Sequence, residues 1–79
     1  MVGYRLFNLT KDEAIYEYYP MDDRSSIGLV GYNRKNNEWL KLESANNDAD
    51  YYYGSHMWPT LESFQKNGHF ETSGVVVWQ

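Results

Sequence analysis

The 79-residue sequence contains no cysteine and only two histidines, His56 and His69. It can therefore form no disulfide and no thiolate metal site, and two histidines are too few for a histidine-rich metal cage. We accordingly expect no bound metal. The absence of cysteine is also typical of proteins in the reducing cytoplasm, which is the location that we expect for this protein.

Long apolar runs and clustered basic residues are missing as well. No stretch approaches the length needed to span a membrane, and the first nine residues lack the basic segment and apolar run of a signal peptide. The formal charge is −4, with seven scattered Lys and Arg against eleven Asp and Glu. Nucleic-acid binding needs a clustered basic surface, so we expect no nucleic acid as partner. The lack of a long apolar run leads us to expect no membrane as partner either.

The motifs of the common enzyme classes are also absent. The sequence has no G-x-G-x-x-G, H-E-x-x-H or C-x-x-C pattern, and no serine or threonine in a nucleophile-elbow or Walker context. The segment NNDAD at residues 46–50 has oxygen ligands that suit calcium but lacks the glycine and glutamate that an EF-hand loop requires, which indicates a polar turn. These absences favour a non-catalytic protein without a cofactor.

Aromatic residues, in contrast, are abundant: eight tyrosines, three tryptophans and three phenylalanines. The chain is long enough for one core and too short for two, so we predict a single domain over residues 1–79. A core of this size supplies about 3–5 kcal/mol of net stability. Without disulfides or metals, any further stability has to come from the burial of aromatic side chains or from oligomerisation.

Alternating hydrophobicity predicts two β-hairpins. The first joins strands at residues 2–9 and 14–20, with Ala14, Tyr16 and Tyr18 pointing inward. The second spans residues 27–43 around the turn sequence RKNN. Its turn, centred between residues 35 and 36, predicts the pairs Tyr32–Trp39, Gly31–Leu40 and Leu29–Leu42.

In the second hairpin we expect Leu29, Leu40 and Leu42 to face the core. The opposite side, with Val30, Tyr32, Trp39 and Lys41, would then face outward.

The spacing of the apolar residues changes after residue 55. Met57, Leu61 and Phe64 recur at helical spacing, and Gly68 is suited to a C-terminal cap, which together predict a helix over about residues 57–67. The final run VVVW has no polar alternation, so we expect a last strand that is covered on both faces and central in the sheet. The predicted fold is α+β: an antiparallel sheet of about five strands with the helix packed on one face.

The leading functional hypothesis is binding of a protein partner, or homodimerisation, through an exposed aromatic patch. Val30, Tyr32 and Trp39 would form this patch, because the single helix cannot cover it while it packs on the leucine face. Exposed aromatic patches are typical of partner surfaces.

Two alternatives centre on the stretch DADYYYGSHMW. A small-ligand pocket could lie near the start of the helix, lined by Tyr51, Tyr53, His56 and Trp58. A minimal enzyme could use His56, with Asp48 or Asp50 setting the imidazole tautomer. Whether residues 51–53 are a loop, a strand or the start of the helix stays open.

The C-terminal part resembles a group of small uncharacterised bacterial proteins. In these, a tyrosine and a histidine precede a helix, followed by G-x-[F/Y], an acidic residue, a glycine and a valine-tryptophan ending. The matching residues here are the tyrosines at 51–53, His56 and the run NGHFETSGVVVW, so that the resemblance covers about residues 51–79. The sequence departs from the pattern at Gln79, where an aromatic residue is expected. The resemblance implies a bacterial origin and assigns no activity to any residue.

Overall fold

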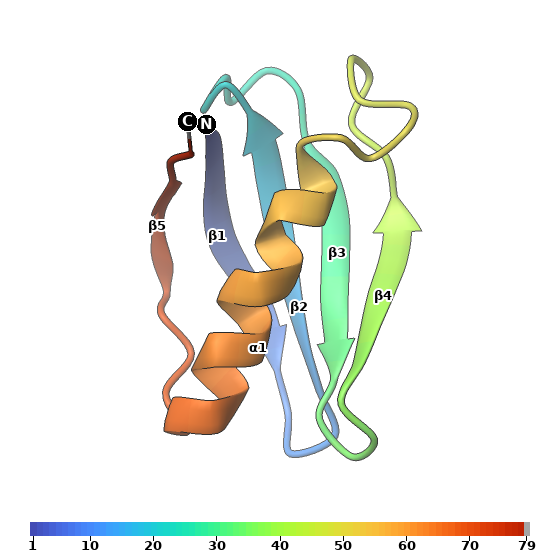
Figure 1. Ribbon diagram of the computed structural model, residues 1–79. Coiled ribbons are helices and arrows are strands. Elements are labelled where there is room, and N and C mark those ends of the chain that lie inside the picture. Colours follow the sequence, from blue (N-terminus) through green and yellow to red (C-terminus); the bar gives the residue numbers. More distant parts are fainter. Residues whose placement is uncertain (79) are drawn as a thin grey trace.

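The computed structural model, which describes residues 1–78, is a five-stranded antiparallel sheet with one short helix across one face (Figure 1). This is the predicted α+β architecture. Gln79 lies outside the described residues. The strands lie in the order β4-β3-β2-β1-β5. Their bounds, with those of the helices, are β1 (Val2–Leu9), β2 (Glu13–Pro20), β3 (Gly28–Asn33), β4 (Glu38–Glu43), the 3-10 turn η1 (Gly54–His56), α1 (Met57–Asn67) and β5 (Ser73–Val76).

Both hairpins form where the alternation predicts them. β1 pairs with β2 and β3 pairs with β4, and Tyr32 lies opposite Trp39 as the turn register requires. The register shifts at the far end of the second hairpin. A bulge at Leu42 there places Glu43, instead of Leu42, opposite Leu29.

The helix has the predicted bounds and the predicted buried stripe. Met57 and Leu61 are buried, and Phe64 packs against the same core one turn later. Gly68 ends the helix with a φ of 74°, a left-handed conformation that glycine adopts without strain. Its N–H donates to the carbonyls of Phe64 and Gln65, so that the cap predicted from the sequence is confirmed.

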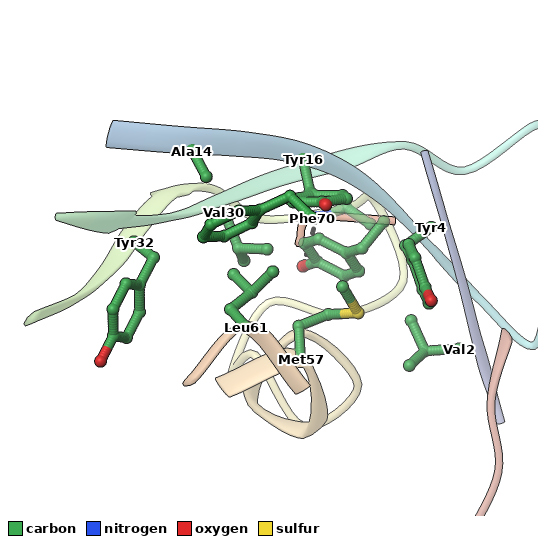
Figure 2. Packing of buried hydrophobic residues seen from close by; sticks show 11 residues of the cluster. Val2, Tyr4, Ala14, Tyr16, Val30, Tyr32, Met57, Leu61 and Phe70 are labelled. Atoms are coloured by element: carbon green, nitrogen blue, oxygen red, sulfur yellow. Dashed lines mark hydrogen bonds between the residues drawn. The ribbon is translucent and has the colours of Figure 1, made fainter. Parts of the chain in front are cut away.

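The core lies between α1 and the face of the sheet that carries tyrosine and valine (Figure 2). The rings of Tyr4 and Tyr16 meet edge to face with centroids 5.6 Å apart, and Phe64 packs 6.1 Å from Tyr16. Such pairs stabilise a core beyond their buried area. The sheet residues of this face with the deepest burial are Val2, Tyr4, Ala14, Tyr16, Tyr18, Val30 and Tyr32.

The prediction that the leucines of the second hairpin face the core is wrong. Val30 is 0% exposed and Tyr32 is 1% exposed beneath the helix, whereas Leu42 is 46% exposed on the other face. The reason is the pairing of the two hairpins. β2 lies beside β3 with Tyr16 opposite Val30, so both side chains point to the same face of one sheet. The helix that covers the tyrosines of β2 therefore covers Val30 as well.

The prediction that the last strand is central is also wrong. β5 pairs only with β1 and forms one edge of the sheet (Figure 1). Val75 is 45% exposed, and Val77, just beyond the strand, is 72% exposed. α1 runs across the sheet and ends near the base of β5 (Figure 1). The returning chain therefore joins the sheet at the free edge of β1.

Gly28 sits where β3 passes the ring of Tyr18, and we expect Gly28→Ala to destabilise the fold. An added Cβ would lie 2.2 Å from Cε1 of Tyr18 and 2.8 Å from the backbone N of Ala45. The ring cannot move aside, because its hydroxyl is held by Asp48 and by the N–H of Ala45. Overpacking of this kind costs about 1–3 kcal/mol.

Chemical denaturation of Gly28→Ala and of the wild type measures this cost. Gly68→Ala is the contrasting variant, because a Cβ there meets nothing within 4 Å and only the left-handed backbone is strained. A Gly28→Ala protein as stable as the wild type would contradict the close approach.

Candidate functional site

The tyrosine run is a loop held in place by one buried carboxylate. Asp48 is 2% exposed; its Oδ1 accepts the N–H of Tyr53 at 2.9 Å, and its Oδ2 accepts the N–H of Gly54 at 3.0 Å. Oδ2 also accepts the hydroxyl of Tyr18 at 2.8 Å. Burial, together with the hydrogen bond to Asp48, raises the pKa of Tyr18 well above its ordinary value of 10. Asp48 thus ties the loop to the core.

His56 lies in an aromatic cluster and is not hydrogen-bonded to either aspartate considered as its partner. Its ring stacks on Trp78 with centroids 3.6 Å apart and planes 6° apart, and Tyr52 meets it edge to face. The carboxylate of Asp48 accepts the N–H of Tyr53, and that of Asp50 accepts the N–H of Tyr52. Among residues 1–78 no hydrogen bond joins His56 to a carboxylate, so this geometry sets up no Asp–His pair.

The four side chains considered for a ligand pocket lie in separate places. Tyr53 and His56 belong to the cluster around Trp78, which follows β5 at one edge of the sheet. Trp58 instead stacks on Trp39 of β4, with ring planes 7° apart, at the opposite edge.

Tyr51 lies apart from both groups. It packs on Tyr18, and Nζ of Lys41 lies 5.5 Å from its ring centroid. Since the four residues lie in three separate aromatic groups, the interpretation of this stretch as one pocket loses its geometric basis.

A polar hollow does occur between α1 and the β3–β4 turn. It measures about 270 Å³ and is lined by Tyr32, Asn37, Glu62, Gln65 and Lys66. Burial and the nearby Glu62 carboxylate raise the pKa of Tyr32. The volume of the hollow lies below the range of about 300–1,000 Å³ that is usual for ligand pockets. Only Tyr32 among the predicted site residues reaches it.

The aromatic patch predicted on the second hairpin is not exposed. Val30 and Tyr32 lie beneath α1, and Trp39 stacks on Trp58. The uncovered surface of this hairpin is instead the face that points away from the helix, which we call the open face.

The centre of the open face is apolar. Ile15, Gly31 and Leu40 lie side by side on β2, β3 and β4. Cδ1 atoms of Leu42 and Leu40 would lie 3.4 and 3.5 Å from a Cβ added to Gly31, so both leucines lean over this glycine. Leu29 follows on β3. We call Ile15, Leu29, Leu40 and Leu42 the leucine patch. All four are half-buried or exposed, and no helix covers them.

Acidic residues border the leucine patch. Glu13 and Glu38 flank Asn33 in the neighbouring row, and Glu17 lies opposite Leu29 with Arg5 as its neighbour on β1. Partly exposed apolar side chains beside carboxylates give this surface an apolar centre with an acidic border. The alternation of the leucines is visible in the sequence, but the alternation alone does not show which face of the hairpin the helix covers.

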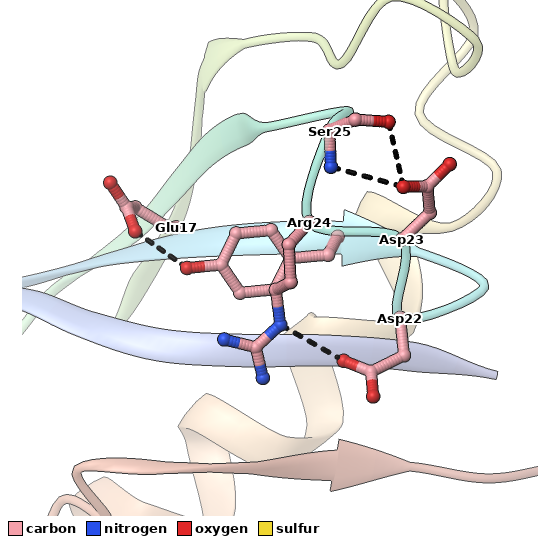
Figure 3. A network of polar contacts seen from close by, with 6 residues as sticks. Glu17, Asp22, Asp23, Arg24 and Ser25 are labelled. Atoms are coloured by element: carbon pink, nitrogen blue, oxygen red, sulfur yellow. Dashed lines mark hydrogen bonds and ion pairs between the residues drawn. The ribbon is translucent and has the colours of Figure 1, made fainter.

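The loop between β2 and β3 covers one end of the open face, where β1 begins and β2 ends (Figure 3). Arg24 lies 4.3 Å from the ring centroid of Tyr19 and pairs with Asp22 at 3.3 Å. The Tyr19 hydroxyl donates to Glu17 at 2.6 Å. The pKa of Tyr19 is raised mainly by burial and further by this hydrogen bond. Ser25 donates twice to Asp23 in the same loop. This loop leaves the leucine patch and the neighbouring Arg5 uncovered.

The comparisons with known proteins identify no relative. The chain matches no protein-family model, no curated protein and no solved structure. Within residues 1–78 no helix is both long and apolar enough to cross a membrane, and no three acidic or histidine side chains gather to hold a metal ion. Function therefore has to be inferred from the surfaces of this chain.

Proposed function

We propose that the protein acts by binding another protein through the leucine patch on the open face. The observation that supports this is the position of Leu42, which is 46% exposed beside three further apolar side chains on a face that no helix covers. Contiguous apolar surface on a small protein is typical of partner-binding sites. The absence of cysteine supports the cytoplasm as the place where this binding occurs.

The border of the patch indicates the chemistry of the partner. Glu13, Glu17 and Glu38 surround the apolar centre, and Arg5 is opposite Glu17. A partner segment with apolar side chains in its middle and a lysine or arginine facing the row of Glu13 and Glu38 would match both features. Charges of opposite sign at such a border mainly raise the rate of association and exclude wrong partners.

We expect Leu42→Lys to lose the partner. The substitution removes an apolar contact at the centre of the patch and places a cation where a basic partner binds. Loss of one buried leucine contact costs about 1.5–3 kcal/mol, which is about a 10- to 100-fold rise in Kd. Affinity capture on immobilised protein, followed by titration of the purified binding protein, measures this effect.

Leu9→Lys is the matched control, because Leu9 is similarly exposed at 42% and lies opposite Ala14, whose side chain is on the other face of the sheet. A protein that binds the wild type and Leu9→Lys but not Leu42→Lys supports the proposal. Equal binding by Leu42→Lys and Leu9→Lys, or no specific binding by the wild type, would refute it.

A further inference from the structure

β5 differs from the other edge strand in carrying no charge. Residues 72–78 read TSGVVVW, with neither a charged residue nor a proline. β4, at the opposite edge, carries Glu38, Lys41 and Glu43. Charged side chains and prolines are the usual means by which edge strands avoid pairing with other chains. β5 has neither protection, so its unpaired backbone groups are available to another strand.

The direction of these backbone groups follows from the pairing with β1. The N–H of Leu6 donates to the carbonyl of Thr72 at 2.8 Å, and Tyr4 lies opposite Gly74 two residues further along. In an antiparallel pair, residues that exchange hydrogen bonds alternate with residues that do not. The N–H and C=O of Gly74 and Val76 therefore point to β1, and those of Ser73 and Val75 point to the free edge.

The sequence of β5 is that of a central strand, although the strand lies at an edge. Val75 and Val76 of β5, with Val77 and Trp78 directly after it, form a run that lacks the polar alternation of a half-exposed strand. In the isolated chain this leaves Val75 45% and Val77 72% exposed. A strand added outside β5 would make it central, which is the position that its composition favours.

We infer that β5 pairs antiparallel with β5 of a second copy of this chain, about a two-fold axis at Val75. In this register Val75 exchanges both hydrogen bonds with its counterpart, and Ser73 does so with Val77 of the other copy. Ser73 and Val75 are the β5 residues whose backbone groups point outward, and Val77 would extend the strand by one residue in the dimer. The opposed residues are uncharged, so no like charges meet across the axis.

Such a contact is self-complementary, as a two-fold interface must be. A foreign strand would need a matching apolar edge of its own, whereas the second copy already supplies one. The two-fold axis perpendicular to the sheet would give one ten-stranded sheet with both helices on the same side. The two leucine patches would then lie on one continuous open face, and a small domain would gain the additional buried surface that its size requires.

The test is the solution mass of the full chain by light-scattering chromatography at concentrations from micromolar to millimolar. The wild type is expected at twice the 9.4 kDa chain mass. Val75→Pro removes an N–H that points away from β1, so the strand can stay paired with β1, and proline is tolerated at such edge positions. Its mass is expected to halve. Val75→Lys adds the charge that protects natural edges, and its mass is also expected to halve.

Val75→Thr is the matched control, because it keeps the branched side chain and the backbone N–H; it is expected to stay dimeric. Circular dichroism shows whether each variant is folded, and Val75→Lys decides the question if Val75→Pro does not fold. A monomeric wild type at all concentrations overturns the inference, and so does a dimer that survives Val75→Lys. Leu42→Lys should remain a dimer, so that failure of the partner proposal and failure of this one are told apart.

Discussion

Replacing Asp48 with alanine is expected to remove most of the stability of the fold. The carboxylate is buried and accepts three hydrogen bonds, from the hydroxyl of Tyr18 and from the N–H groups of Tyr53 and Gly54. Alanine leaves these three donors without an acceptor, and each buried unsatisfied donor costs about 1–3 kcal/mol. The sum matches or exceeds the net stability of about 3–5 kcal/mol expected of a domain of this size.

Removing the carboxylate also removes the cost of burying its charge, which offsets part of the loss. We therefore expect the net effect to lie near the lower end of this sum, at about 3 kcal/mol. Asp48→Asn keeps one carbonyl oxygen and should be intermediate, because its amide nitrogen cannot accept from Gly54. Circular dichroism and urea denaturation of both variants measure the order.

Asp50→Ala is the control for Asp48→Ala. Asp50 is two residues away, exposed, and accepts a single N–H, that of Tyr52. Surface changes of this kind usually stay within about 0.5 kcal/mol. If Asp48→Ala were as stable as Asp50→Ala, Asp48 would not be the residue that holds the loop.

The role of Asp48 illustrates what could be predicted from the sequence and what could not. The alternation, the turn residues and the helical stripe of Met57, Leu61 and Phe64 determine the elements, because these are local properties. The partners of Asp48 are not local: Tyr18 lies 30 residues away along the chain. An acidic residue near a histidine is visible in the sequence, whereas three donors from a distant strand and a turn are not.

The wrong prediction of which face of the second hairpin is buried has a similar cause. Alternation separates Val30 and Tyr32 from the leucines, but it does not say which set the helix covers. That depends on the pairing of β2 with β3, which places Val30 beside Tyr16. Tyr16 was correctly predicted to face inward, so knowledge of this one pairing would have oriented the hairpin correctly and identified the leucine patch on the outside.

The tyrosine-rich core leads to the second large effect, which is a steep loss of stability in alkali. Tyr16 and Tyr18 are both 0% exposed, and burial raises the pKa of each well above the ordinary value of 10. Repulsion from Tyr4 and Glu71 adds to the shift at Tyr16. Both hydroxyls act as donors in the fold, to the carbonyl of Glu71 and to Asp48. The folded state therefore requires their protons.

The sign of the effect follows from the difference in bound protons between the two states. Below pH 10 both states hold the tyrosine protons, so the contribution of these groups to stability is fully present. Above pH 10 the unfolded chain loses protons that the folded chain keeps, so the free energy of unfolding falls as the pH rises toward the folded pKa values. Two such tyrosines lower it by about 3 kcal/mol per pH unit, so we expect cooperative unfolding at about pH 11–12.

An alkaline titration followed by circular dichroism and tyrosinate absorbance tests this. Tyr16→Phe loses one hydrogen bond at neutral pH, which costs about 1 kcal/mol, but its stability should fall less steeply above pH 10 because one proton fewer is linked to unfolding. Tyr52→Phe is the matched control, since Tyr52 is 53% exposed and should leave the alkaline midpoint unchanged. If the free energy of unfolding fell with pH equally steeply in the wild type and in Tyr16→Phe, the buried Tyr16 hydroxyl would not be linked to alkaline unfolding. The loss of a hydrogen bond lowers the stability at every pH, whereas only a hydroxyl that must keep its proton changes this slope.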